Sequence, residues 1–126
     1  MSEAITLNSY RRRWAAHNAG LIAMKPIAFM AFGDGGHNPD MTSKSPDEEA
    51  TQLFHEVYRK PLAAITQADL YSVTGQGTVE AHELIGIAVS EAALVDADGN
   101  LCGIKTFAPK HKEGDERYAI NLTLRF

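Results

Sequence analysis

The stretch Tyr118-Ala119-Ile120-Asn121-Leu122-Thr123-Leu124-Arg125-Phe126 decides how this chain folds. Apolar residues stand at every second position, and small or polar residues stand between them. Because side chains of a β-strand alternate between its two faces, this pattern predicts a strand with one face in the core. A strand of this kind needs hydrogen-bonded neighbours, and the preceding sequence supplies candidates.

Further segments have the composition of strands, namely residues 27–32, 70–74, 78–82, 87–95 and 101–107. The tripeptide Gly75-Gln76-Gly77 predicts a hairpin connection between the second and third of them. The step Asp98-Gly99 predicts a turn between the last two, because glycine tolerates the left-handed backbone that such turns use. The strands are therefore expected to form a mainly antiparallel sheet.

Two helices are expected to accompany the strands. Apolar residues recur at helical spacing over residues 7–19, which predicts a helix that ends at Gly20 and docks through Trp14. The sequence Ser45-Pro46-Asp47-Glu48 has the form of a capping box with proline at the first helical position, so a second helix is predicted to run to about residue 55. The predicted fold class is α+β, with one or two helices packed on the sheet.

Length and composition bound the kind of protein. The chain has 126 residues, 44% of them hydrophobic and 22% charged, so residues 1–126 are expected to form one domain. The net charge is −4 and the main basic run, Arg11-Arg12-Arg13, would spread around a helix, which argues against a nucleic-acid partner. The sequence has neither a targeting segment nor an apolar run of membrane-spanning length, so synthesis in the cytoplasm and no membrane partner are expected.

The residues that could carry chemistry do not form a recognised pattern. The stretch Gly33-Asp34-Gly35-Gly36 lacks the residues that dinucleotide- and phosphate-binding loops require. Asp96, Asp98 and Asn100 match three ligands of a calcium loop, but Leu101 stands where that loop needs glycine. The histidines lack zinc-site spacing, and the single cysteine, Cys102, is expected to be buried. The sequence therefore predicts no enzyme, no cofactor and no metal.

The longest irregular segment should run from Gly33 to Ser45, where glycine, proline, serine and threonine are frequent. Its glycine-rich start predicts a tight turn in which Gly33 or Gly35 has a positive φ. A loop of this kind is able to present backbone groups to a partner, and it is equally consistent with an ordinary surface loop.

Three segments, in this order, resemble the phage tail-collar and tail-fibre family. They are Met30-Ala31-Phe32-Gly33-Asp34-Gly35, His55-Glu56-Val57-Tyr58-Arg59 and the stretch from Val89 to Leu101, Val-Ser-Glu-Ala-Ala-Leu-Val-Asp-Ala-Asp-Gly-Asn-Leu. Family members carry similar patterns, with asparagine at the position of His55, Val-Gly in place of Ala92-Ala93, and phenylalanine in place of Val95. The order of the three segments is more specific than any one of them.

The resemblance implies a non-enzymatic structural component of a phage or prophage tail, which attaches a tail fibre to the baseplate. The partners that it implies are baseplate proteins and other fibre subunits, with copies of the chain in a trimer. It also implies synthesis in the bacterial cytoplasm and assembly into the phage tail. The candidate contact residues are Gly33, Asp34, Gly35, Val57, Tyr58 and Arg59.

The residues alone leave an alternative open. A small bacterial ligand-binding or hydrolytic α+β domain would have a pocket near the Gly33–Gly36 loop, with that loop as one wall. His37, Asp34 or His82 would then supply acid–base chemistry.

Overall fold

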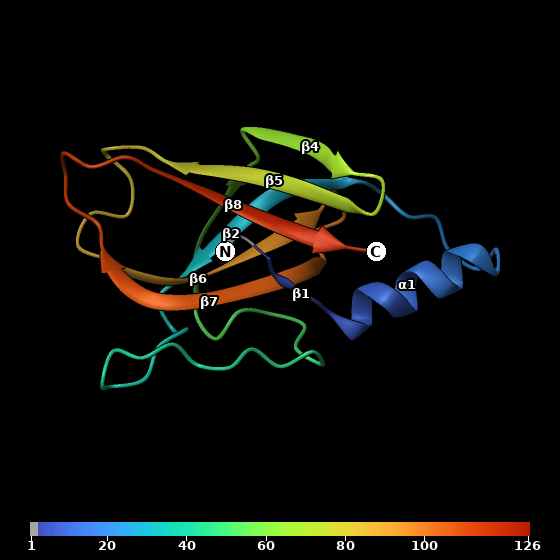
Figure 1. Ribbon diagram of the computed structural model, residues 1–126, viewed down its shortest axis with the longest axis horizontal. Coiled ribbons are helices and arrows are strands. Elements are labelled where there is room, and N and C mark those ends of the chain that lie inside the picture. The colour runs from blue at the N-terminus through green and yellow to red at the C-terminus, as the bar shows by residue number, and fades with distance from the viewer. Residues whose placement is uncertain (1–2) are drawn as a thin grey trace.

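The computed structural model describes residues 3–126, which form two antiparallel β-sheets and one short helix (Figure 1). The larger sheet has five strands in the order β1-β7-β6-β2-β3, and the smaller has three in the order β4-β5-β8. The strands are β1 (Ile5–Thr6), β2 (Ile27–Gly33), β3 (Glu56–Pro61), β4 (Ala64–Asp69), β5 (Ser72–Val79), β6 (Ala88–Asp96), β7 (Leu101–His111) and β8 (Tyr118–Arg125), and the helix is α1 (Asn8–Asn18).

The predicted α+β class is wrong, because the chain is mostly β and the second helix does not form. Residues 46–55 make turns and bends instead. The amide of Glu49 donates to the Asp47 carboxylate at 2.9 Å, which closes a local turn in place of a helical one. The Glu49 carboxylate accepts from Arg12 at 2.8 Å and from Asn8 at 2.6 Å, so it ties this loop to α1.

The predicted first helix is confirmed as α1, but it docks through a different residue. Tyr10 is 4% exposed, whereas Trp14 is 38% exposed and lies one turn further from the body of the protein. The two rings meet edge to face with centroids 6.1 Å apart. Gly20, with φ of 77°, follows the helix as predicted. Figure 1 shows α1 extending from one end of the sheets, which explains why only its first turn is buried.

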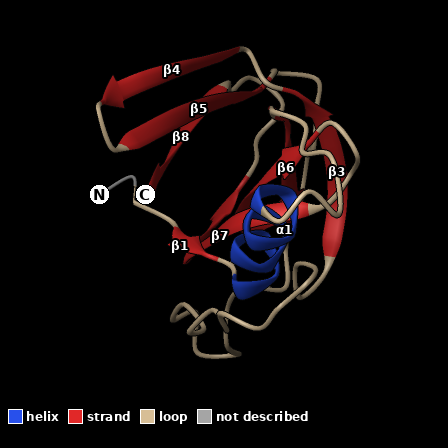
Figure 2. Cartoon of the chain, turned by 90° about the vertical axis from the view of Figure 1, so that its right-hand side faces the viewer, coloured by secondary structure: helices blue, strands red, loops and turns tan. Residues whose placement is uncertain are grey.

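The core lies between the two sheets, as Figure 2 shows end-on. The predicted strands over residues 27–32, 87–95, 101–107 and 118–126 are confirmed as β2, β6, β7 and β8. Strand β6 is buried along almost its whole length, because the small sheet covers one side and residues 34–55 pack on the large sheet at the other. Cys102 is also buried as expected, and burial raises the pKa of its thiol to about 12. No helix within the described residues 3–126 has the length and apolarity to cross a bilayer.

The predicted hairpin at Gly75-Gln76-Gly77 is wrong, since these residues lie inside the continuous strand β5. A Cβ atom at Gly75 would stand 2.6 Å from a methyl group of Leu94, and one at Gly77 would collide with Met30. These glycines allow the small sheet to approach the large one closely, a use that does not require a turn. The actual hairpin joins β4 and β5 through Leu70 and Tyr71.

The same close approach gives a test at Gly103 on β7. A Cβ atom there would collide with the buried Leu124 side chain and stand 2.9 Å from the backbone oxygen of Ile5. We expect Gly103→Ala to lower the free energy of unfolding by about 1–3 kcal/mol, measured by urea denaturation, because the sheets must separate to admit the methyl group. Gly114→Ala is the matched control, since its nearest neighbour would lie at 3.6 Å. Equal stability of the two variants would contradict this account.

Candidate functional site

The three segments that carry the family resemblance lie on neighbouring strands. Strands β3, β2 and β6 are adjacent in the large sheet. Gly33, at the end of β2, pairs with Glu56 on β3 and with Glu91 on β6. One step earlier, Phe32 pairs with Tyr58 on one side and with Ala92 on the other. Residues from all three segments therefore share the same rows of the sheet.

A buried carboxylate, that of Glu91, joins the ends of these segments. One of its oxygens accepts from the amide of Phe54 at 2.9 Å. The other accepts from the amides of His55 at 2.9 Å and Gly35 at 3.1 Å. Glu91 is fully buried, so the three amides take the place of water as its hydrogen-bond donors. We refer to Glu91 with these three residues as the Glu91 cluster.

The glycines beside the cluster are required for space. A Cβ atom at Gly33 would lie 2.5 Å from the backbone oxygen of His55, and one at Gly36 would lie 2.5 Å from that of Ser90. At Gly35 it would lie 2.9 Å from the amide nitrogen of His55. The predicted positive φ at Gly33 or Gly35 is wrong, because among the described residues positive-φ glycines occur only at 20, 86 and 99. Backbone packed against backbone, rather than a tight turn, explains this glycine-rich stretch.

Two histidines near the cluster have separate partners. The His55 imidazole lies 2.5 Å from the Asp34 carboxylate, and the hydrogen bond and charge of Asp34 raise the pKa of His55 above its ordinary 6.5. This pair is partly open to solvent. His37 contacts the hydroxyl of Ser90 at 2.8 Å, and this buried hydroxyl also accepts from the amide of Gly36 at 2.9 Å. Asp34 and His37 are therefore bound to different residues and do not form a paired acid and base.

The remaining predicted residues lie along β3. Tyr58 stacks on Phe32 with ring centroids 6.4 Å apart, and its hydroxyl donates to Glu83. Arg59 pairs with Glu56 at 2.8 Å and donates to the backbone oxygen of Gly99 at 3.2 Å. Val57 precedes Tyr58 on the same strand and is partly exposed.

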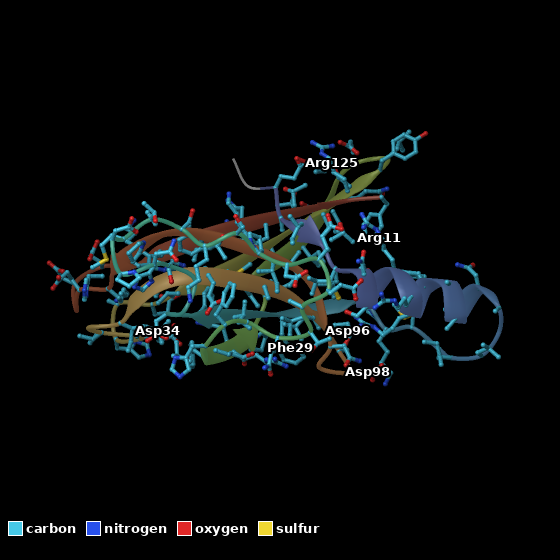
Figure 3. The ribbon with its side chains drawn as sticks, turned by 90° about the horizontal axis from the view of Figure 1, so that it is seen from below. Arg11, Phe29, Asp34, Asp96, Asp98 and Arg125 are labelled. Carbon is cyan, nitrogen blue, oxygen red and sulfur yellow. The ribbon has the colours of Figure 1, made fainter. Side chains whose placement is uncertain are left out.

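The six predicted residues consequently do not form one cluster of side chains. Gly33, Asp34 and Gly35 lie at the Glu91 end of the sheet, whereas Arg59 reaches the turn over residues 96–100. Figure 3 shows Asp34 and Asp96 well separated along the long axis of the molecule.

The turn over residues 96–100 is held by a second buried acid. One oxygen of Asp96 accepts from the amides of Asp98 and Asn100 at 3.0 Å each, and the other lies 3.5 Å from the Arg13 guanidinium. Gly99 has φ of 91°, which confirms the predicted left-handed turn. Backbone amides and Arg13 thus account for the acid at the start of the calcium-like pattern. Within residues 3–126 no group of three or more His, Cys, Asp or Glu side chains is placed to hold a metal ion.

Sequence reasoning missed the roles of Glu91 and Arg13. The signal for Glu91 was available, because it is the lone acid within the apolar run from Ile87 to Val95. Arg13 had no such signal, since Arg11 and Arg12 precede it and only the fold determines which of the three turns inward. Arg13 donates to the backbone oxygen of Leu101 at 3.0 Å as well as pairing with Asp96.

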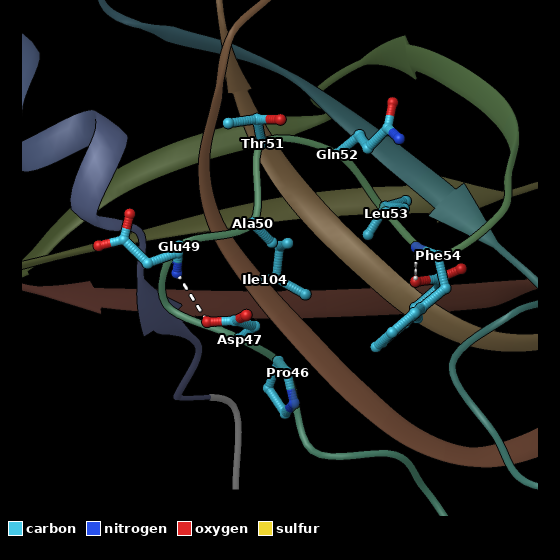
Figure 4. A pocket seen from close by; sticks show the side chains of 10 residues that line it. Pro46, Asp47, Glu49, Ala50, Thr51, Gln52, Leu53, Phe54 and Ile104 are labelled. Carbon is cyan, nitrogen blue, oxygen red and sulfur yellow. Dashed lines mark hydrogen bonds between the residues drawn. The ribbon is translucent and has the colours of Figure 1, made fainter.

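A pocket of about 420 Å³ lies next to the Glu91 cluster (Figure 4). Its wall is the loop over residues 46–54, closed by Glu91 and Ile104. The Gly33–Gly36 loop does not line it, and neither Asp34, His37 nor His82 faces it. Both Glu91 oxygens already accept hydrogen bonds from backbone, so the carboxylate has a structural role in the wall.

Comparison with known proteins adds no relative. No protein-family model matches the chain, and no curated protein matches it. The resemblance to tail-collar proteins therefore depends on the three quoted segments.

The Glu91 cluster makes a prediction about stability. We expect Glu91→Ala to lower the free energy of unfolding by about 3 kcal/mol or more, because it leaves buried amides without an acceptor. Amide hydrogen exchange should accelerate at Gly35, Phe54 and His55 in particular, since these are the groups that lose their partner. Glu48→Gln, an exposed change in the adjoining loop, is the control. Unchanged exchange at the three amides would contradict the assignment.

A second prediction concerns acid. Burial opposes ionisation of Glu83, but hydrogen bonds from Lys60, Tyr58 and the amide of Glu80 lower its pKa from 4.5 to about 2. A carboxylate with a lowered pKa stabilises the fold above its ordinary pKa and loses that contribution as pH falls toward the lowered value. We expect Glu83→Gln to lower the free energy of unfolding by about 1–3 kcal/mol at neutral pH, measured by urea unfolding. Between pH 4.5 and about 2, the free energy of unfolding of this variant should fall less steeply than that of the unchanged protein. An undiminished acid dependence in this variant would contradict the assignment.

Proposed function

We propose that this chain is a structural, non-enzymatic attachment domain that joins a tail fibre to the baseplate of a phage or prophage tail. Its partners on this proposal are baseplate proteins and other fibre subunits, with three copies of the chain at the base of one fibre. It would be made in the bacterial cytoplasm and assembled into the tail.

The observation that supports the proposal most is that the three resembling segments contact one another. Glu91 from the third segment accepts hydrogen bonds from Gly35 of the first and His55 of the second. Arg59 of the second donates to Gly99 of the third. Chance matches at three separate places would have no reason to meet in space. Segments inherited together because they pack together would meet in this way.

The geometry also indicates which candidate residues are able to touch a partner. Gly33 is buried, and the amide of Gly35 is used by Glu91, so both act by holding the loop in place. Asp34, Val57 and Arg59 are partly or fully exposed and are the better candidates for direct contact. A rigid loop with accessible polar groups suits an adaptor, which needs a fixed surface more than a reactive one.

The alternative of a ligand-binding or hydrolytic domain has less support. Its one favourable feature is the pocket of about 420 Å³, which is lined by residues of the 46–54 loop with Glu91 and Ile104 and not by the Gly33–Gly36 loop that was expected to form it. The residues proposed for its chemistry, Asp34 and His37, do not line that pocket. The carboxylates in the lining already have partners: Asp47 accepts from the amide of Glu49, Glu49 accepts from Arg12, and Glu91 accepts from backbone amides.

Mass spectrometry of purified tail particles tests the proposal directly. Prophages are induced in the strain that encodes the chain, and intact particles are separated from soluble protein. We expect peptides of this chain in the particles, in a fixed ratio to baseplate proteins. A strain with the gene deleted serves as the control for peptide assignment. Particles that lack these peptides, with the protein free in the cytosol, would refute the proposal.

A further inference from the structure

We propose that a groove between β7 and β8 binds an extended segment of a partner protein, in which apolar residues alternate with acidic ones. The groove is lined by Val89, Lys105, Phe107, Lys110, Tyr118, Ala119, Ile120 and Asn121 and has a volume of about 230 Å³. The proposal extends beyond fibre attachment and does not depend on it, because it follows from strand edges and charge alone.

The groove lies between two strand edges that face the same side of the molecule. Strand β7 pairs with β6 along one edge, but on its other edge only Gly103 and Ile104 pair, with β1. Strand β8 pairs with β5, and its other edge contacts the chain through the bridge from Thr123 to Glu3. The same N-terminal segment thus touches both edges at one end of the seam, as Figure 2 shows.

Beyond that segment, residues 3–126 place no further strand along the seam. Residues 105–111 of β7 have no ladder partner on this edge within the described chain, nor do residues 118–122 of β8. Backbone donors and acceptors along an open edge are the groups that an added strand pairs with, and Pro109 is the one residue of this β7 edge that has no N–H to donate. A partner segment would lie beyond Glu3, in line with residues 3–6, along residues 105–111 of β7 and 118–122 of β8.

The floor of the groove selects apolar side chains. Val89 and Tyr118 are buried beneath it, and Phe107 and Ile120 are partly buried at its sides. Since alternate side chains of an added strand point the same way, every second residue of the partner would face this floor. The volume has room for an apolar side chain to enter between the sheets.

The rim of the groove selects acidic side chains. Lys105 and Lys110 have no carboxylate within 4 Å in the described chain, and Lys110 lies 4.3 Å from the centre of the Tyr118 ring. Among the described residues no carboxylate lines the groove, and the nearest acid named by a contact is Glu116, which accepts from the Tyr118 hydroxyl at 3.4 Å. Most other basic side chains are paired with acids, namely Arg12, Arg13, Lys25, Arg59, Lys60, Arg117 and Arg125. Two unpaired lysines on a chain of net charge −4 therefore give this seam a local charge that complements acidic residues.

The test uses the whole chain labelled with ¹⁵N and a blocked six-residue peptide of alternating glutamate and valine. We expect chemical-shift changes confined to residues 105–111 and 118–122, with slower amide exchange along those edges, and an affinity that falls as salt is added. The same peptide with lysine in place of glutamate should bind at least about fivefold more weakly. Shifts elsewhere, or equal binding of the lysine peptide, would overturn the proposal.

Charge variants separate the rim from general electrostatics. Lys105→Gln with Lys110→Gln should weaken the glutamate peptide about fivefold while leaving the fold intact. Lys25→Gln with Lys44→Gln removes the same charge away from the groove and should leave the affinity unchanged. Equal loss in both double variants would overturn the proposal. Octanoate is titrated in parallel, and octanoate binding without peptide binding would show a small-molecule site and refute strand addition.

Discussion

The hydrogen bonds from three backbone amides to the buried carboxylate of Glu91 are the constraint on which much of this structure depends. A charge that far from water costs several kcal/mol unless donors surround it. Within residues 3–126 no basic side chain pairs with it, and the donors come from the backbone of residues 35, 54 and 55. The loop between β2 and β3 consequently has to close on β6 at both of its ends. Glycine at positions 33, 35 and 36 follows from that closure, because the chain packs there with no room for a Cβ atom.

Asp96, at the other end of β6, repeats the arrangement with a different set of partners. It accepts from the amides of the following turn and pairs with Arg13, which belongs to α1. The helix is otherwise attached through Tyr10, its buried residue, through the bond from Arg13 to the backbone oxygen of Leu101, and through exposed contacts of Asn8 and Arg12 with Glu49. One strand thus carries two buried acids, and each fixes a peripheral element. Loop 34–55 depends on Glu91, and the position of α1 depends on Asp96 together with Tyr10.

Sequence patterns predicted the strands that alternate or are wholly apolar, such as 27–32 and 118–126, because the side chains that a strand buries recur at regular positions in the sequence.

The patterns failed where a residue's role depends on a contact with a residue far away in the sequence. Glycine has two uses, positive φ and the absence of a Cβ atom, and the sequence does not distinguish them. The glycines of β5 were therefore interpreted as a turn, although Leu94 and Met30 explain them. The helix predicted after Ser45 failed for a similar reason, since Arg12 and Asn8, far away in sequence, bind Glu49 inside the predicted helix. The sequence predicted which segments form the candidate site, but not how they are arranged. Glu91 joins them through backbone amides, and every residue except proline has such an amide, so the sequence does not mark these contacts.

No family model matches the chain, and the resemblance is carried by three short segments in which constrained and tolerant positions differ. Core positions accept many apolar side chains if the total volume is kept, so overall similarity fades readily. The departures within the segments are of this tolerant kind. Ala92, Ala93 and Val95 are buried residues of β6, where a change in one side chain can be offset by a neighbour. His55 supplies Glu91 with a backbone amide that any residue but proline provides, and its side chain donates to Asp34 as an asparagine would. Gly33, Gly35 and Glu91 are less tolerant, because a Cβ atom at either glycine would collide with its neighbours and the buried amides need the carboxylate, and the resemblance includes all three positions.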